Sequence, residues 1–273
     1  MSENRDYAKQ TEPEYKVRSY NWKTAIGLQQ VDGLTPSKYL IETANSNISG
    51  EISLAEAERR IAEYYEQKPA LSDEEKRSEE ADKVATHIAQ ILANKTFKLA
   101  PIELLAIHRQ LFDGVFEHAG KIRDCNMSKS EWVLGEESVV YDDYRMARES
   151  LEYDFEREKA FDYSKLDERQ TIEHIVKFIA DLWQIHAFRE GNTRAIAVFT
   201  IKYLRTFGYD VTNDTFEKHS WYFRNALVRA NYNNRKDGIV ATRVYLTHFF
   251  ENLFFGGKHE LRNRSLHVRE GNA

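Results

Sequence analysis

Residues that interrupt helices are scarce along this chain. It contains 4 Pro and 12 Gly among 273 residues, and they are spread along the sequence. An architecture of many short strands needs frequent turns, and Gly and Pro are the residues that most often make them. A sequence with so few of them is more consistent with long helices, so the chain is predicted to fold mainly into helices.

Composition and charge narrow the class of protein further. Hydrophobic residues make up 41% and charged residues 30%, as in a globular chain with a substantial core. Even the longest uninterrupted apolar runs, such as Ile196–Phe199, are too short to span a bilayer. The polar start Met1–Asp6 lacks the apolar stretch of a signal peptide, so neither a membrane segment nor export is expected. A single cysteine, Cys125, excludes an internal disulfide framework. These features together predict a cytoplasmic protein.

The net charge also excludes one class of partner. It is −5, and the basic residues are dispersed along the chain. Nucleic-acid binding without sequence preference needs a basic surface that neutralises phosphates. No nucleic-acid partner is therefore expected, and the oligomeric state is left open, with a homo-oligomer among the alternatives.

Four segments are expected from charge and periodicity. Residues 1–18 are polar and unpatterned and are predicted to be a flexible arm, 19–71 a small helical unit, 72–257 the main domain and 258–273 a charged tail. Ser72 and Glu75 form a capping box, which predicts a helix start rather than a loose linker between the two units.

Three short helices are expected within the small unit. The first runs to Val31 and stops at Gly33, Thr35 and Pro36 start the second as N-cap and first helical residue, and Ser53 caps the third. In the main domain, apolar residues recur at helical spacing in several stretches, each predicting an amphipathic helix. The exception is Asp124–Asp142, whose valines and Trp132 predict a short β-hairpin-like element.

The loop between two of these helices, residues 186–194, concentrates groups that suit phosphate chemistry. His186 ends the first helix and, with an unperturbed pKa of about 6.5, can accept a proton at cellular pH. Glu190 offers the oxygen ligand that Mg²⁺ prefers, and Mg²⁺ commonly links a carboxylate to substrate phosphates.

The second half of the loop is expected to bind the phosphates themselves. Gly191, Asn192 and Thr193 open the next helix, where unpaired N–H groups and the positive end of the dipole form an anion site. Arg194 adds a planar guanidinium suited to phosphate. On spacing alone, an ordinary polar loop is the alternative interpretation: Glu190 and Arg194 would then be a surface pair, Asn192 or Thr193 an N-cap, and His186 a cation at a helix C-terminus.

The loop resembles the signature of Fic-domain proteins, His-x-Phe-x-Asp/Glu-Gly-Asn-Gly-Arg-x-x-Arg. The matching residues are His186, Phe188, Glu190, Gly191, Asn192 and Arg194. The resemblance extends from about Ile102 to Phe255. It implies an all-α fold: a Fic helical bundle with a small β-hairpin flap at Ser128–Tyr141, preceded by a small N-terminal helical unit. The flap would hold a target segment by β-augmentation.

The resemblance implies a protein adenylyltransferase, which moves AMP from ATP to a Ser, Thr or Tyr hydroxyl of a target protein. His186 would then be the general base and Glu190 the Mg²⁺ ligand. Gly191, Asn192 and Thr193 would cradle phosphate oxygens through backbone and side-chain donors, and Arg194 would neutralise the β-phosphate. At the nucleotide base, Asn231 would meet the adenine edge with Arg224 nearby. These expectations need Mg²⁺ as cofactor and ATP as substrate.

Two departures from the family pattern leave the nucleotide donor open. Thr193 stands at the second glycine position, and Ala197 replaces the second arginine, which in the family contacts the γ-phosphate and pairs with an inhibitory glutamate. The alternatives are a Fic-type transferase that uses another nucleotide donor or transfers phosphate, and a nucleotide-binding module without turnover.

Residues Ala25 to Tyr65 look like the antitoxin-like segment that many Fic proteins carry. In its inhibitory motif the glutamate position falls on Asp32, followed by Gly33, and the Ser/Thr position falls on Leu28. Since Ala197 also replaces the arginine partner, the segment is expected to dock on the core without inhibiting through that salt bridge. The alternative is that it is simply additional core for the bundle.

Four other histidines match no helical metal spacing and are expected to be capped or surface residues: His87, His108, His118 and His174.

Overall fold

The computed structural model describes residues 15–209 and 214–268, and within them the fold is helical. The helices are α1 (Tyr15–Gly27), α2 (Lys38–Ser49), α3 (Leu54–Glu66), α4 (Asp73–Ala93), α5 (Pro101–Leu111), α6 (Ala147–Lys159), α7 (Glu168–Ile185), α8 (Asn192–Thr206), α9 (Thr215–Asn231) and α10 (Val244–Phe255). Short 3₁₀ turns lie at η1 (Leu28–Asp32), η2 (Trp132–Leu134), η3 (Tyr163–Lys165) and η4 (Asn263–Leu266). The predicted all-α fold is confirmed. No helix in the described ranges has both the length and the apolarity to cross a membrane.

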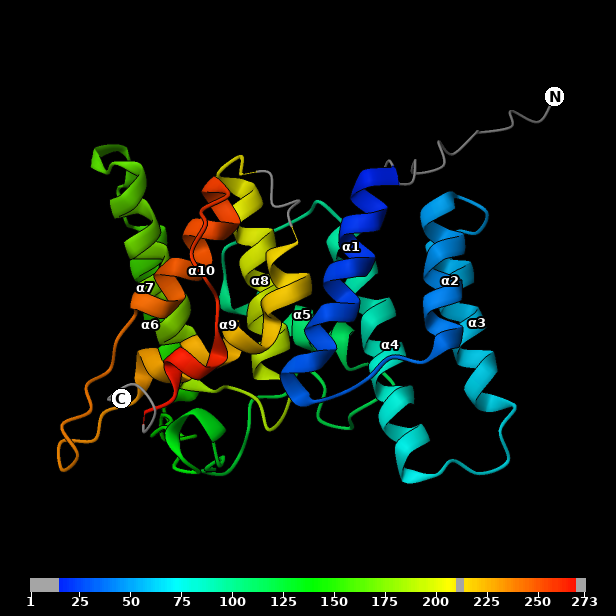
Figure 1. The fold of residues 1–273 in the computed structure, drawn as a ribbon, viewed down its shortest axis with the longest axis horizontal. Helices are drawn as coiled ribbons and strands as arrows, with labels where there is room; N and C mark the ends of the chain where they lie inside the picture. The colour runs from blue at the N-terminus through cyan, green and yellow to red at the C-terminus, as the bar shows by residue number, and fades with distance from the viewer. Residues whose placement is uncertain (1–14, 210–213, 269–273) are drawn as a thin grey trace.

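Figure 1 shows the helices standing side by side, with α2 and α3 at one end of the row and α6 and α7 at the other. Helix α8 lies inside the bundle, and every residue from Asn192 to Leu204 is buried. Its neighbours include α5, α7 and α4. The loop that leads into α8 is therefore attached to the most deeply buried helix of the fold, which holds it in place.

The expected β-hairpin at Asp124–Asp142 is wrong in its detail. The described residues of this segment contain one isolated antiparallel bridge, between Glu131 and Glu137, closed by the 3₁₀ turn η2. Val133 and Leu134 are consecutive in that turn and both are buried. Two adjacent side chains of a strand point to opposite faces, so burying both against one core favours a turn over a strand. We call residues 128–141 the flap.

Most of the predicted helix boundaries of the N-terminal unit are confirmed, with two corrections. Gly33 adopts the left-handed conformation and ends η1, and the side chain of Ser53 caps α3. Helix α1 begins at Tyr15, so residues 15–18 of the expected flexible arm are helical, and residues 1–14 lie outside the described ranges. Helix α2 is capped by Ser37 rather than Thr35, because the Ser37 hydroxyl accepts a hydrogen bond from the N–H of Leu40.

Helix α1 packs closely against the main domain. It contacts α4 and α9, and a Cβ atom at Gly27 would lie 2.4 Å from the carbonyl oxygen of Glu217 on α9. Only a residue without a side chain allows that approach. The buried residues of α1 belong to the same continuous core as those of α7 and α8. The end of α1 and η1 are thus fixed relative to the loop before α8.

A buried carboxylate joins three helices of the N-terminal half. Asp82 on α4 accepts hydrogen bonds from the Ser37 N–H at 2.8 Å, the Ser37 hydroxyl at 2.5 Å and the Tyr65 hydroxyl at 2.8 Å. Burial raises the pKa of Asp82, and the hydrogen bonds from Ser37 and Tyr65 work against that rise. This network ties the start of α2 and the end of α3 to α4.

Replacing Asp82 by Ala should lower the free energy of unfolding by about 2–4 kcal/mol, because it leaves the buried Tyr65 hydroxyl without its acceptor. Urea denaturation followed by circular dichroism measures the change. Asp73→Ala is the matched control, since that carboxylate is exposed in the first turn of the same helix. A loss no larger in Asp82→Ala than in the control would contradict the role given to this network.

Candidate active site

The sequence between α7 and α8 forms a tight turn that begins at His186. This residue adopts the left-handed conformation with φ of 50°, which ends α7. The Arg123 Nε atom donates a hydrogen bond of 2.7 Å to the His186 carbonyl, and the Arg123 N–H donates one of 2.8 Å to the Ala187 carbonyl. Arg123 is itself buried. The backbone conformation at His186 is therefore fixed by a side chain from the segment before the flap.

The His186 ring is buried without a hydrogen-bond partner. It is 3% exposed, stacks on Tyr141 of the flap at 3.8 Å between ring centroids, and meets the edge of Trp183 at 5.3 Å. Neither ring nitrogen has a hydrogen-bond partner within the described part of the chain. Burial, followed by the charge of Lys129, holds the pKa of His186 well below its usual value. The ring is thus neutral at neutral pH and can accept a proton.

Gly191 begins α8 in a conformation that only glycine fits here. Its φ is 74°, and a Cβ atom would lie 2.2 Å from Cζ of Phe112. No side chain caps this end of the helix. The first N–H groups of a helix have no intrahelical acceptor, and the helix dipole adds positive potential there. The start of α8 has the backbone donors that the sequence predicts for an anion site.

Two side chains of this turn already make hydrogen bonds within the protein. Asn192 accepts a hydrogen bond from the Phe188 N–H at 2.9 Å and donates one to the Phe188 carbonyl at 2.7 Å. The Thr193 hydroxyl accepts a hydrogen bond of 3.0 Å from Trp183 Nε1. Both were expected to offer side-chain donors to phosphate. Asn192 thus holds the loop in shape, whereas the Thr193 hydroxyl only accepts in its bond and keeps its hydrogen to donate, next to the backbone N–H groups at the start of α8.

Arg194 is held by acidic and amide groups from the N-terminal half. Its Nε lies 2.8 Å from Asp32 Oδ2, without hydrogen-bond alignment. One terminal nitrogen donates to Glu80 at 2.7 Å and the other to Gln29 at 3.2 Å. The guanidinium also lies over the Phe112 ring, 4.8 Å from its centroid. The phosphate-binding position predicted for Arg194 is therefore filled by internal partners.

This contact bears on the expectation for Asp32. The sequence predicts that the N-terminal segment docks on the core without inhibiting through the salt bridge to the second arginine of the family pattern, because Ala197 stands at that position. Ala197 is fully buried within α8, but Asp32 reaches Arg194 instead. Gly33 follows in the left-handed conformation that ends η1 and turns the chain. An acid–arginine contact is present at a different arginine from the one expected.

Arg224 on α9 lies between two carboxylates. Its Nη2 donates to both oxygens of Glu131 in the flap, at 2.9 and 2.8 Å, and its Nη1 lies 3.5 Å from Asp32. Glu131 is 2% exposed, and burial raises its pKa while Arg224 opposes the rise. Arg224, which the resemblance places near the nucleotide base, thus contacts the same aspartate as Arg194. Asp32 lies between the two arginines.

Glu190 lies at the open side of the loop. Its side chain is 50% exposed, and one carboxylate oxygen is 2.8 Å from Lys129 Nζ of the flap. An exposed carboxylate oxygen beside uncapped helix N–H groups suits Mg²⁺, which usually takes one or two carboxylates together with substrate phosphates. Glu190 therefore fits Mg²⁺ as a ligand, and Lys129 contacts one of its two carboxylate oxygens.

Asn231 ends α9, and both of its amide hydrogens are in use. Its Nδ2 donates to the carbonyls of Ala180 and Leu227, each at 3.0 Å. The bond to Ala180 joins the C-terminal end of α9 to α7, and the bond to Leu227 lies within α9. A contact of Asn231 with an adenine edge would have to use its Oδ1 atom.

Two residues that position the loop were not predicted from the sequence. His108 is fully buried rather than capped at the surface: its Nδ1 accepts from the Gly120 N–H and its Nε2 lies 2.9 Å from the Glu190 carbonyl. Its ring also stacks on Phe188 at 3.7 Å. Arg123 is the second. An isolated arginine and histidine give no periodic signal, so only their place within the resemblance to the family pointed to them.

The protonation of His108 should make the stability of the protein depend on pH. Burial lowers the pKa of His108 to about 4, against about 6.5 in an unfolded chain. As the pH falls, the unfolded state binds the proton first. The contribution of neutral His108 to the free energy of unfolding is therefore complete above about pH 6.5 and is lost as the pH falls toward 4. From pH 7 to 5 the contribution is about 2 kcal/mol.

Urea denaturation at the two pH values measures this effect, and His108→Gln, which keeps a donor and an acceptor, should lose less stability between pH 7 and 5 than the wild type by about that amount. Arg109→Gln, an exposed neighbour on α5, is the control and should behave as the wild type does. An unchanged pH dependence in His108→Gln would contradict the role given to this histidine.

The chain is similar to known proteins over its central part. Residues 98–204 match the family model described as Fic/DOC family. A probable protein adenylyltransferase, y4lH, from Sinorhizobium fredii (strain NBRC 101917 / NGR234) is 29% identical over 130 residues, which cover 46% of this chain and 62% of that protein. The chain thus matches less than two thirds of the length of this relative. The matched residues of the family model include the loop before α8 and both positioning residues, His108 and Arg123.

Proposed function

We propose that this chain is a protein adenylyltransferase, which transfers AMP from ATP to a hydroxyl side chain of a target protein, on the premise of the match of residues 98–204 to the Fic/DOC family model. One observation supports this above the others: His186 presents a neutral, buried imidazole with two unpartnered nitrogens at the beginning of the loop that leads to the uncapped start of α8. A proton acceptor beside an anion site is what nucleotidyl transfer to a hydroxyl requires. The name of the relative from Sinorhizobium agrees with the proposal.

The proposed reaction uses these groups in a single substitution. A Ser, Thr or Tyr hydroxyl oxygen of the target forms a bond to the α-phosphorus of ATP, and the bond from that phosphorus to the bridging oxygen breaks, releasing pyrophosphate. The hydroxyl proton passes to a nitrogen of His186. The N–H groups at Gly191–Arg194 bind phosphate oxygens, where the developing negative charge lies close to the start of the helix.

Glu190 would hold Mg²⁺ in this proposal. The ion would neutralise phosphate charge and help to orient the leaving group. Lys129 contacts one oxygen of the Glu190 carboxylate, which leaves the other oxygen for the ion. If Lys129 left the carboxylate, its ammonium would be free for a phosphate oxygen.

The nucleotide donor is the part of the proposal with the fewest contacts behind it. Ala197 offers no charge toward a γ-phosphate, and Thr193 adds a side chain that packs against Trp183. The alternatives to AMP transfer from ATP are a different nucleotide donor, transfer of phosphate, and nucleotide binding without turnover. Intact mass of the modified protein separates them, since AMP, UMP and phosphate add different masses.

Replacing His186 by Ala should reduce transfer at least about a hundredfold, because the substitution removes the proton acceptor. The assay incubates the protein with labelled ATP and Mg²⁺ and measures label in the protein. Nucleotide binding should persist within a few-fold, since the backbone donors of α8 remain. His87→Ala on α4 is the control. Equal labelling in His186→Ala and the wild type would exclude His186 as the base.

We also propose that the N-terminal half of the chain competes with nucleotide for Arg194. Asp32 and Glu80 hold the guanidinium from two sides, and Asp32 also faces Arg224. A triphosphate needs the same cations, so binding requires these carboxylates to give way. The Asp32 contact lacks hydrogen-bond alignment, which makes it the weaker of the two.

Asp32→Asn and Glu80→Gln should each raise ATP affinity, by about tenfold, because each removes a charged competitor from Arg194. Isothermal titration with a non-hydrolysable ATP analogue measures the affinity. Glu79→Gln is the matched control, since Glu79 is the neighbouring acid on α4 and pairs with Lys83. Affinities equal to that of the control would show that the acidic contacts do not restrain nucleotide binding.

A further inference from the structure

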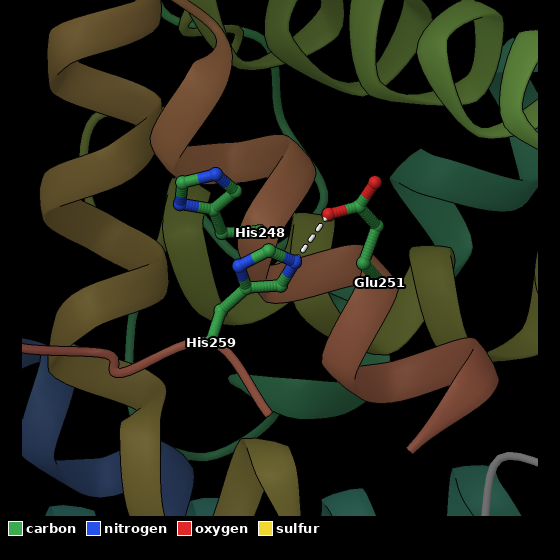
Figure 2. A group of neighbouring side chains, drawn as sticks. All are labelled: His248, Glu251 and His259. Carbon is green, nitrogen blue, oxygen red and sulfur yellow. Dashed lines mark ion pairs between the residues drawn. The ribbon is translucent and has the colours of Figure 1, made fainter. Parts of the chain in front are cut away.

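Two histidines and a glutamate gather at the C-terminal end of α10, outside the candidate active site. Figure 2 shows His248 and Glu251 on the helix and His259 on the chain that returns past it. Their ligand atoms all lie within 4.8 Å of one another. The His259 Nε2 atom is 2.6 Å from Glu251 Oε2. Neither the sequence periodicity nor the proposed function accounts for this cluster.

The local sequence builds the cluster in two steps. His248 and Glu251 are three residues apart on α10, a spacing that places side chains on the same face of a helix. Gly256 then ends the helix in the left-handed conformation and turns the chain back. Asn252 fixes the returning segment, because its side chain accepts from the His259 N–H at 2.9 Å and donates to the His259 carbonyl at 2.8 Å.

The two imidazole rings of the cluster are stacked on each other. The His248 and His259 rings stack with centroids 4.1 Å apart and an interplanar angle of 7°. One nitrogen of each ring and a carboxylate oxygen of Glu251 lie within 4.8 Å of one another, and unprotonated imidazole and carboxylate groups coordinate metals.

We propose that His248, Glu251 and His259 bind one divalent transition-metal ion, with zinc as the best match. Imidazole nitrogen suits zinc and its neighbours in the first transition row, whereas Mg²⁺ and Ca²⁺ prefer oxygen ligands throughout. Two histidines and a glutamate are a known type of zinc ligand set, with the fourth position left to water or another molecule. Bonds of about 2.0–2.1 Å need the three ligand atoms to draw closer together than they now lie.

The side chains have room for that adjustment. The His259 side chain is 39% exposed and that of Glu251 is 26% exposed, so a ring rotation at His259 meets little resistance. His248 and Glu251 also line a surface cavity of about 460 Å³ between α7, α9 and α10, with Arg169 and Arg243 on its wall. Solvent therefore reaches the place where the fourth ligand would bind.

The position of His259 gives the proposed site a structural consequence. The chain that follows it runs to η4, where the Arg229 side chain on α9 donates to the Leu266 carbonyl at 2.6 Å. It then reaches the flap, where the Val268 N–H donates to the Val133 carbonyl at 2.9 Å. A metal ion would fasten the start of the segment whose end pairs with the flap.

Zinc titration of the full-length protein, after dialysis against chelator, tests the site. Isothermal titration should show one zinc bound per chain. His248→Gln, Glu251→Gln and His259→Gln should each weaken binding at least about tenfold, since the loss of a group that merely supports a ligand already has that effect. Cobalt(II) supplies a second readout, because visible absorption reports its coordination geometry and should change in the same three variants.

Three controls distinguish zinc bound at this cluster from zinc bound elsewhere on the chain. Glu260→Gln removes an exposed carboxylate next to His259, and His87→Gln removes a distant histidine; both should bind zinc as the wild type does. Glu190→Gln should do so too, which keeps the test independent of the proposed active site. Zinc binding that is absent in the wild type, or equal in the wild type and all three ligand variants, would show that the cluster is only an ion pair of Glu251 with protonated His259.

Discussion

The candidate site depends on the hold that Arg123 has on the end of α7. A helix normally ends with carbonyls exposed to solvent, but here they are buried, and Arg123 donates to those of Ile185 and His186 and, in the facing segment, to that of Asp142. A buried guanidinium needs acceptors, and buried carbonyls need donors, so each makes the burial of the other tolerable. The left-handed turn at His186 follows from this arrangement. It lets the loop cross to the start of α8 while the imidazole stays inside.

Keeping the imidazole inside works against stability. Each buried polar atom without a partner destabilises a fold by about 1–3 kcal/mol, and His186 has two. The stacking on Tyr141 and the edge contact with Trp183 offset part of that loss through aromatic packing. A residue with no role other than packing would be better replaced by an apolar side chain. The unfavourable burial fits a functional residue, because a neutral imidazole keeps one ring nitrogen that can take up a proton, whereas a protonated ring has none.

Much of the fold was predictable from the sequence, because helix periodicity and capping are local signals. The capping box at Ser72, the stop at Gly33 and the all-α class needed no knowledge of tertiary contacts. The flap was mispredicted since its apolar residues suit a strand locally, but Val133 and Leu134 are buried together in a turn. Within the loop, the residue types were predictable and their partners were not. Asn192 and Thr193 carry polar side chains whatever they contact, and only the packed structure shows that Asn192 bonds to the loop backbone and that Thr193 accepts from Trp183 on α7.

The partners of Arg194 and Arg224 were equally unpredictable from the sequence. Arg194 on α8 and Arg224 on the next helix, α9, both lie next to Asp32, which is far from both along the chain. Burying two guanidinium groups without carboxylates would be prohibitive, so the fold needs internal anions around them. Asp32 and Glu80 supply them from the N-terminal half and Glu131 from the flap. In the proposed function, nucleotide binding would be an exchange of anions, and its affinity would depend on how tightly the internal ones are held.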